Sequence, residues 1–263
     1  MEVIDVTEKI IDIQGLSHVV GNRFLIKDVN WTVNKGERWV VFGENGSGKT
    51  TLLSIIAGFE NYEYGSCKLF GQEQKETELD SLRKKLGWVS SSFFDKRYSK
   101  ETALNIVLSG INGELGLRDN IKNQDVLIAK KLIKAIGLQS KVNQPYYTLS
   151  KGEQQNILII RALMSRPEVL ILDEPCTGLD LLARERVFRW MAYLSEEQSM
   201  TLIYVTHYVE EITDIYHNML LLRQGKVYFN GKIDDGSKNK ILNQYFDVRH
   251  EECKREANRY AGN

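Results

Sequence analysis

Apolar and polar residues alternate in two segments near the start of the chain, IIDIQGL at 10–16 and FLIKDVNWTV at 24–33. A short apolar run, RWVVF at 38–42, follows them. These patterns predict β-strands. The segment KTTLLSIIAGF at 49–59 then has apolar residues at helical spacing, and we expect its helix to stop at Gly58. The predicted order is strand, glycine-rich loop, helix.

The middle of the chain changes from strand-like to helical patterning. Residues 66–70 and 86–90 are typical of short strands, and the charged segment at 77–85 between them predicts a helix. Residues 100–139 have helical apolar spacing without alternation, which predicts an inserted helical segment with a loop at 109–120. The apolar positions behind this prediction are Leu104, Val107, Leu108, Leu127, Leu132, Ile133 and Ile136.

After Pro145, helices and short apolar strands alternate again. Helices are expected at 155–164 and from about Leu179 to Ser195. The apolar runs VLILDEP, TLIYVTH and MLLLRQGKVYF are expected to contain strands. Strands separated by helices of this length predict an α/β fold with a mostly parallel sheet.

Composition agrees with a folded core and excludes several classes of protein. Of 263 residues, 42% are hydrophobic and 27% charged, which is ordinary for a globular protein. The 35 basic and 35 acidic side chains cancel, so no overall positive field attracts nucleic acid or anionic lipid. The basic stretch KREANRY beside the mixed stretch RHEEC near the C-terminus is interpreted as a solvated helix face without a function.

The cysteines and the N-terminus indicate the compartment. Cys67, Cys176 and Cys253 are odd in number and have no CxxC spacing, so neither a disulfide framework nor a zinc site is predicted, as expected in a reducing cytosol. The start of the chain has no signal-peptide pattern, and no uncharged apolar run approaches the roughly 18 residues of a membrane span. We therefore expect the chain itself to be soluble.

The first chemical motif is G-x-x-x-x-G-K-T at 43–50, between a predicted strand and a predicted helix. Its glycines allow successive N–H groups to point at phosphate oxygens, and the helix dipole adds to this attraction. Lys49 is expected between the β and γ phosphates, and the Thr50 hydroxyl on Mg²⁺. The predicted ATP-binding residues are Gly43, Glu44, Asn45, Gly46, Ser47, Gly48, Lys49, Thr50 and Thr51.

The second motif is VLILDE at 169–174, a buried strand that presents two carboxylates at its end. Asp173 is expected to bind Mg²⁺ together with Thr50. Glu174 is expected to polarise the attacking water as general base. The cofactors predicted for this site are therefore ATP and Mg²⁺.

The third motif, LSKGE at 149–153, precedes a predicted helix that runs through Arg161. With the other two motifs it resembles the ATP-binding cassette (ABC) ATPase family, whose signature is usually LSGGQ or LSGGE. The resemblance covers nearly the whole chain, including TGLD ending at Asp180 and, later, His207. It implies a P-loop NTPase of ABC type, with a mostly parallel core sheet, an N-terminal antiparallel β subdomain and an inserted helical subdomain.

The resemblance also implies roles for residues outside the phosphate loop. The signature of one chain is expected to contact the γ phosphate held by another, in a head-to-tail dimer with two ATPs; an ordinary helix-capping serine at Ser150 is the alternative. Asp180 would link the two sites, and His207 would contact the γ phosphate as a catalytic residue beside Glu174 and Lys49. The implied trans contacts are Ser150, Lys151, Gly152 and Glu153.

Three positions depart from the family pattern. Val20 stands where many members have an aromatic residue that stacks on adenine, with His18 and Phe24 as nearby substitutes. Ser91 stands at the glutamine of the coupling loop, so we expect metal contact there to go through water. Lys151 replaces a signature glycine. Together with the serines, it resembles a single-domain branch labelled molybdate-transport-like or photorepair-like.

The domain organisation expected from this resemblance is a single ABC ATPase domain over residues 1–263. Its nucleotide-binding core would cover about 10–90 and 165–232, and its helical subdomain, with the signature, about 91–164. Residues 233–263 would form a C-terminal helical tail.

The function expected is that of an ATP-hydrolysing transporter subunit, cytoplasmic and peripheral on the membrane, which dimerises with a second copy of itself and docks on a membrane-spanning permease. The alternative is an ABC ATPase that acts on nucleic acid or a ribosome. The neutral charge disfavours this alternative, and the missing glutamine favours it. A module that binds ATP without hydrolysis is disfavoured because Asp173, Glu174 and His207 are all present.

Overall fold

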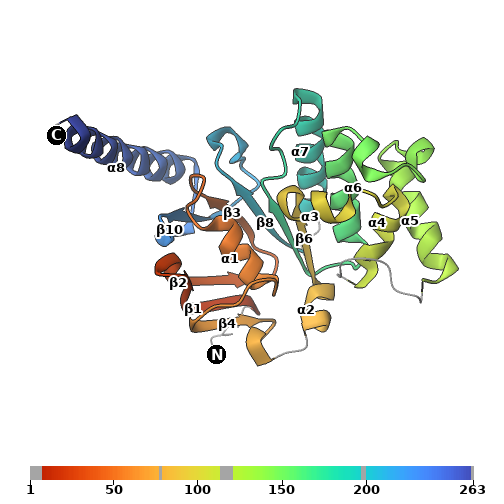
Figure 1. Cartoon of the computed structure of the whole chain (residues 1–263), viewed down its shortest axis with the longest axis horizontal. Coiled ribbons are helices and arrows are strands. Elements are labelled where there is room, and N and C mark those ends of the chain that lie inside the picture. Colours follow the sequence, from red (N-terminus) through yellow and green to blue (C-terminus); the bar gives the residue numbers. More distant parts are fainter. Residues whose placement is uncertain (1–7, 77–78, 113–120, 197–199, 262–263) are drawn as a thin grey trace, which may run out of the picture.

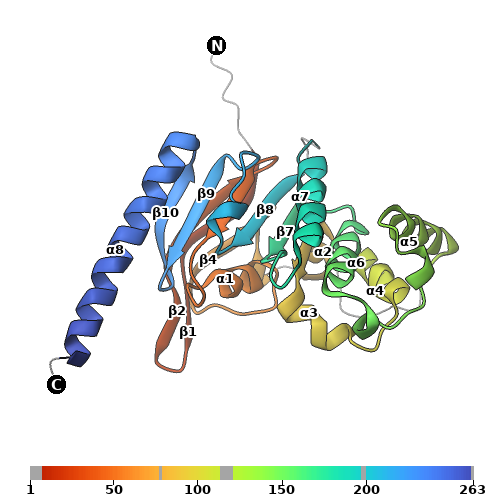
Figure 2. The ribbon, with the colours of Figure 1, turned by 90° about the horizontal axis from the view of Figure 1, so that it is seen from above.

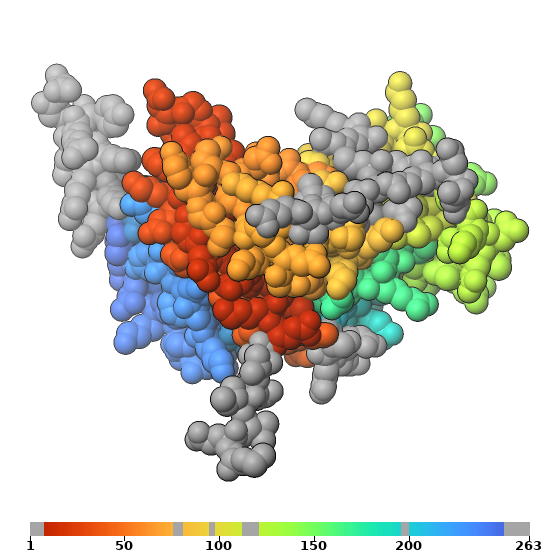
Figure 3. Space-filling view, turned by 90° about the horizontal axis from the view of Figure 1, so that it is seen from below, coloured from red at the N-terminus to blue at the C-terminus, as the bar shows by residue number. Residues whose placement is uncertain are grey.

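The structure, a computed structural model, describes residues 8–76, 79–112, 121–196 and 200–261. Two β-sheets lie next to each other with helices beside them (Figure 1). In the space-filling view, the N-terminal residues (red) lie between the later residues drawn in blue and the helical segments drawn in yellow and green (Figure 3).

The N-terminal sheet has four strands in the order β2-β1-β4-β5, and every neighbouring pair is antiparallel. In β2, buried side chains such as Val29, Trp31 and Val33 alternate with more exposed ones, as the sequence pattern predicts. The antiparallel N-terminal subdomain is confirmed. The strands are β1 (Lys9–Val20), β2 (Arg23–Asn34), β4 (Tyr64–Leu69) and β5 (Gln72–Glu73).

The second sheet has six strands in the order β10-β9-β3-β8-β7-β6. Its neighbouring strands are parallel except for the hairpin of β9 and β10. Every residue of β6, β7 and β8 is buried, as expected for a parallel sheet covered on both faces. The strands are β3 (Arg38–Phe42), β6 (Leu86–Ser90), β7 (Val169–Asp173), β8 (Thr201–Thr206), β9 (Asn218–Arg223) and β10 (Lys226–Lys232).

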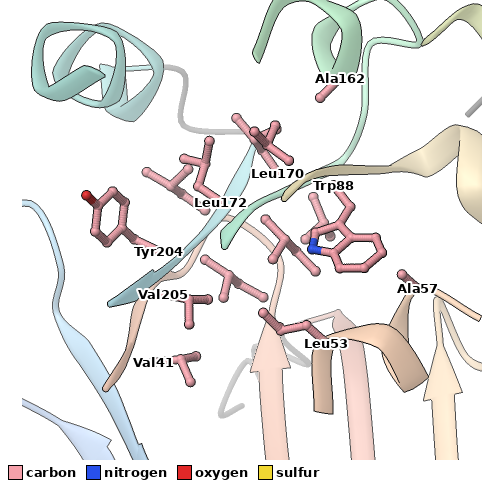
Figure 4. Close-up of a cluster of buried hydrophobic side chains, with 14 of the residues drawn as sticks. Val41, Leu53, Ala57, Trp88, Ala162, Leu170, Leu172, Tyr204 and Val205 are labelled. Atoms are coloured by element: carbon pink, nitrogen blue, oxygen red, sulfur yellow. The ribbon is translucent and has the colours of Figure 1, made fainter. Parts of the chain in front are cut away.

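Helix α1 (Lys49–Ile56) lies between the two sheets (Figure 1). Its Leu53 is fully buried near Val41 and Val205 of the six-stranded sheet (Figure 4). The chain leaves the helix at Gly58, whose φ of 71° suits glycine, so the predicted helix stop is confirmed.

Helices and short 3₁₀ turns form the described part of the chain between β6 and β7. The expected loop at 109–120 lies mostly outside the described residues, and so do the first two residues of the helix expected at 77–85. The α-helices around and within this part are α2 (Leu79–Lys85), α3 (Ser91–Tyr98), α4 (Ala103–Ser109), α5 (Asn123–Ala135) and α6 (Lys151–Leu163). The 3₁₀ turns among the described residues are Gln74–Glu76, Gly110–Asn112, Gln139–Lys141, Tyr146–Thr148 and Val209–Glu211.

Two helices follow β7 and β10. Helix α7 (Leu181–Glu196) begins two residues later than expected because Asp180 stays outside it and accepts a hydrogen bond from the Ala183 N–H at 2.9 Å. Helix α8 (Asp235–Ala261) lies along β10 (Figure 2). None of the helices, as far as their residues are described, combines the length and hydropathy needed to cross a membrane.

A buried arginine joins α3, α4 and α6. Arg161 of α6 is only 4% exposed, and its Nε donates to the Tyr98 hydroxyl at 2.8 Å and to the Ser109 hydroxyl at 3.2 Å. Its guanidinium lies 4.5 Å from the centre of the Phe94 ring. A buried cation is tolerated only where such partners replace water. These contacts therefore hold the helical segments together.

Replacing Tyr98 by Phe should lower the free energy of unfolding by about 1.5–3 kcal/mol, because the buried guanidinium loses an acceptor. Urea unfolding measures the change. Tyr64→Phe is the matched control, since Tyr64 is 62% exposed, and it should stay within about 0.5 kcal/mol of the parent. Equal stabilities of the two variants would contradict this role of Arg161.

Candidate active site

The phosphate loop joins β3 to α1, and its backbone curls around the Lys49 ammonium. Lys49 Nζ donates to the carbonyl oxygens of Gly43 at 2.7 Å and Glu44 at 2.9 Å. Gly46 and Gly48 have φ values of 78° and 102°, which residues with a side chain rarely adopt. Gly48 is the N-cap of α1 and has no side chain to cap it, so the first N–H groups of the helix are left for an anion.

Lys49, Glu174 and His207 meet at the carboxyl edge of the six-stranded sheet. Glu174 follows β7 and His207 follows β8, and β8 lies between β3 and β7. Glu174 Oε1 lies 3.4 Å from Lys49 Nζ and 3.0 Å from His207 Nδ1. Burial lowers the pKa of Lys49, and Glu174 opposes this change. The structure thus brings together the three residues that the sequence nominates as catalytic.

The backbone of Glu174 has an unusual conformation. Its φ is 49°, in the left-handed region that non-glycine residues rarely occupy. Its N–H donates to the Val205 carbonyl at 3.0 Å, which extends the sheet contact by one residue. Strain of this kind persists only where the surrounding structure enforces it. Here it turns the Glu174 side chain toward Lys49 and His207.

Asp173 is buried beside this group and suits a divalent cation. Burial raises its pKa to about 6, and nearby Glu174 adds to the effect, while Ser90, Lys49 and Thr50 oppose it. Its Oδ2 accepts from the Ser90 hydroxyl at 3.1 Å. Its Oδ1 has no hydrogen-bond partner among the described residues, although it is buried. An unpaired carboxylate oxygen beside the Thr50 hydroxyl fits Mg²⁺, which prefers oxygen ligands.

Ser91 lies in a different element from the one that the sequence predicts. Ser91 begins helix α3, so it does not lie in a loop as expected. The contact to Asp173 comes from the preceding residue, Ser90, because the register of β6 and β7 pairs these two residues directly. The parallel pairing of β6 and β7, which only the fold reveals, is the signal that distinguishes the two serines. The water-mediated role expected of Ser91 stays a prediction.

The signature forms the N-terminus of α6, which starts inside the motif and not after it. The Ser150 hydroxyl accepts from the Glu153 N–H at 3.3 Å, and Glu153 Oε2 accepts from the Ser150 N–H at 3.0 Å, a capping box. Burial opposes ionisation of Glu153, but Lys141 Nζ, 2.6 Å from Oε1, and the Ser150 N–H outweigh it and lower its pKa. Both carboxylate oxygens of Glu153 therefore hold the signature in place.

The signature also touches the segment that contains Asp180. A Cβ placed on Gly152 would come within 2.8 Å of the Ala183 Cβ, so this glycine allows α6 and α7 to approach. Asp180 caps the same turn of α7. The signature and Asp180 are thus parts of one packed unit.

The sequence interpretation missed a buried carboxylate behind His207. Glu211 is 1% exposed, and its oxygens accept from Arg184 Nη2 at 2.7 Å, the Thr206 hydroxyl at 2.6 Å and the Tyr204 hydroxyl at 3.1 Å. The Thr206 hydroxyl also accepts from the Tyr208 N–H at 3.0 Å. Glu211 therefore holds Thr206 directly and, through the Thr206 hydroxyl, Tyr208, which are the residues before and after His207. In the sequence it is one of many glutamates, without a motif to mark it.

The residues considered for the adenine contact lie in different surroundings. His18 is buried and its Nδ1 lies 3.2 Å from Glu63 Oε2, so its imidazole contacts another side chain of the protein instead of facing a base. Val20 is 55% exposed near the end of β1. Phe24 lines a cavity of about 560 Å³ that it shares with phosphate-loop residues 44–47, and Val20 does not line this cavity. Among the three, Phe24 has the position expected of a base contact.

These features define a P-loop nucleoside-triphosphatase fold, and comparisons with known proteins identify its family. A family model for the ABC transporter matches residues 26–177. The chain is 38% identical over 241 residues to the uncharacterized ABC transporter ATP-binding protein YlmA of Bacillus subtilis, covering 91% of each chain. It is 32% identical over 225 residues to the zinc uptake system ATP-binding protein ZurA of Listeria innocua, covering 85% of this chain and 86% of ZurA.

A solved structure agrees with these relatives. A dimeric ATP-binding cassette in a post-hydrolysis state, bound to ADP and Pi, is 25% identical with a TM-score of 0.71, covering 85% of this chain and 99% of the other. The chain belongs to the ABC transporter family, and it is an ATP-binding cassette of that family.

Replacing Ser90 by Ala should weaken Mg²⁺ about tenfold or more in an ATP-binding or ATPase assay titrated with Mg²⁺, because residues that orient a metal ligand typically affect metal affinity by this much. Ser91→Ala is the control and should change the Mg²⁺ dependence by less than about twofold. A larger effect at Ser91 than at Ser90 would show that the hydrogen bond to Asp173 does not govern the metal site.

Proposed function

We propose that this chain hydrolyses ATP to ADP and phosphate with Mg²⁺, as one half of a head-to-tail dimer attached to a membrane-spanning permease. The observation that carries the proposal is the contact of Glu174 with both Lys49 and His207. A carboxylate between a phosphate-binding lysine and an imidazole is placed to accept a proton from water that attacks a bound phosphate.

The phosphates are bound by this chain's own loop. Its N–H groups and the Lys49 ammonium take phosphate oxygens as acceptors, in place of the carbonyl groups of Gly43 and Glu44 that now hold the lysine. His207 keeps Glu174 oriented through the 3.0 Å contact and is expected to reach the γ phosphate with its remaining ring nitrogen. Glu174 then accepts the proton of the attacking water.

Thr50 and Asp173 are the residues that would hold Mg²⁺. The unpaired buried Oδ1 of Asp173 supports this assignment. When bound, the ion supplies positive charge that offsets the negative charge of the phosphate groups. Asp173 is held in a fixed position for the ion, because its other carboxylate oxygen, Oδ2, accepts a hydrogen bond from the Ser90 hydroxyl.

A second copy of the chain is expected to complete the site. The first turn of α6, with residues 150–153, offers N–H groups and the Ser150 hydroxyl to the γ phosphate bound by the partner. Asp180, packed beside the signature through α7, is expected to link the two sites. The dimeric relative bound to ADP and Pi supports this arrangement.

A permease partner is proposed from the relatives, whose names describe ATP-binding proteins of ABC transporters and, for ZurA, a zinc uptake system. We place the chain on the cytoplasmic face of the membrane, bound to a separate membrane-spanning subunit. Transport would then follow from dimers that close on ATP and separate after hydrolysis.

Glu174→Gln should lower the steady-state ATPase rate by about 100-fold or more, because the general base is lost while the phosphate contacts remain. The same variant should form an ATP-dependent dimer that is visible by size-exclusion chromatography with light scattering. Glu185→Gln, a change on the exposed surface of α7, should hydrolyse at the parental rate. Parental turnover in Glu174→Gln would remove Glu174 from the mechanism.

The partner is tested by isolating the tagged full-length chain from detergent-extracted cells that express it naturally. A membrane-spanning protein should be isolated in stoichiometric amount, and Arg189→Ala, at an exposed position of α7, serves as a neutral control. Isolation of a ribosome or nucleic acid without a membrane protein would contradict the permease proposal.

A further inference from the structure

Helix α8 is anchored on the strand that leads into the phosphate loop. Its Tyr245 is 1% exposed and packs edge-on against Phe42, the last residue of β3, with ring centres 6.2 Å apart. Phe246 makes a similar contact with Phe42 at 6.4 Å. Because Phe42 directly precedes Gly43, this aromatic cluster fixes α8 next to the loop.

One turn beyond the anchor, α8 contacts the loop itself. Arg249 Nε lies 2.7 Å from Glu44 Oε1, and both side chains are substantially exposed to solvent. An exposed ion pair of this kind adds only about 0–1 kcal/mol to stability. The pair is therefore free to rearrange when a ligand competes for either partner. The C-terminal segment, to which the sequence assigned no function, thus reaches the nucleotide site.

The cavity beside this ion pair has the size and lining of a nucleoside site. Its volume of about 560 Å³ lies within the range of roughly 300–1,000 Å³ that is usual for small-molecule pockets. The partly exposed ring of Phe24 offers a surface for stacking. The charged residues that line it are Arg23, Glu44, Arg223 and Arg249, so positive charge exceeds negative.

The cavity is also continuous with the phosphate site. It shares Glu44 to Ser47 with the loop that holds Lys49, and the β9–β10 turn closes its side through the Gly225 N–H, which donates to the Ser47 carbonyl at 3.0 Å. A triphosphate seated on the loop would therefore leave its nucleoside beside Phe24 and Arg249.

We infer that α8 is part of the nucleotide site, and that Phe24 stacks on the base of ATP while Arg249 leaves Glu44 to contact the nucleoside of the bound ATP. This inference rests on the proposed binding of ATP by the phosphate loop. The two residues replace the aromatic side chain that is absent at Val20. Bound ATP therefore contacts both the phosphate loop and Arg249 of helix α8, and the helix contributes to nucleotide affinity.

Calorimetric titration of the full-length protein with Mg-ATP and, separately, with Mg-tripolyphosphate tests the inference. Phe24→Ala should weaken ATP about tenfold or more, as expected for a lost stacking contact, and Arg249→Ala about fivefold. Neither variant should change the affinity for tripolyphosphate by more than about twofold, because it has no nucleoside. Phe24→Tyr should retain the parental affinity for ATP.

Matched controls are Tyr147→Ala and Arg189→Ala, exposed residues of the same types elsewhere, which should bind both ligands as the parent does. Val20→Ala should also bind ATP normally. Unchanged ATP affinity in either Phe24→Ala or Arg249→Ala would overturn the inference, as would equal weakening of both ligands.

A separate variant distinguishes failure of this inference from failure of the proposed function. Lys49→Ala should lose both ATP and tripolyphosphate. If Lys49→Ala binds both ligands like the parent, the phosphate loop is not the binding site and the proposed function fails. If Lys49→Ala loses both ligands while Phe24→Ala and Arg249→Ala bind ATP normally, only the role of α8 and Phe24 is wrong.

Discussion

The parallel pairing of β3, β8 and β7 is the constraint on which the rest of the site depends. These three strands are neighbours in the sheet and end at the same edge. The residues that follow their ends are the phosphate loop, His207 and Glu174, which lie far apart in the sequence. In open α/β sheets ligands bind outside the carboxyl ends of the strands for this reason. A slip of one residue in the register would turn each of these side chains away from the others.

The charged side chains at this edge, Lys49, Asp173 and Glu174, influence one another's ionisation. Lys49 is buried, and burial alone would favour its neutral form, but two carbonyl groups and Glu174 support the ammonium. Asp173 is buried beside it, and this burial raises the pKa of its carboxyl to about 6, to which the neighbouring Glu174 adds. Two carboxylates, Asp173 and Glu174, thus lie near one lysine. The proposed divalent cation beside Asp173 would offset this negative charge, and triphosphate oxygens would replace the carbonyl groups of Gly43 and Glu44 as the partners of Lys49.

The sequence indicates those parts of the site that lie within short contiguous motifs. Residues 43–50 and 169–174 predict a loop and a strand end whose geometry the structure reproduces, because local spacing decides both. His207 was predictable only together with these motifs. Contacts set by tertiary packing were not predictable. Ser90 meets Asp173 through strand register, and Arg249 reaches Glu44 because α8 docks on Phe42.

A series of contacts also connects the signature to His207 within one chain. Gly152 of α6 packs against Ala183 of α7, and Asp180 caps the turn that contains Ala183. The next residue, Arg184, is bound to Glu211, which also holds Thr206 immediately before His207. Because tightly packed elements shift together, movement of the signature toward the partner's phosphate in the proposed dimer would also shift α7 and the contacts around His207 of the same chain. Glu174, with its strained backbone, contacts His207 at the end of this path, so the proposed dimer contact and the proposed catalytic geometry would depend on the same packing.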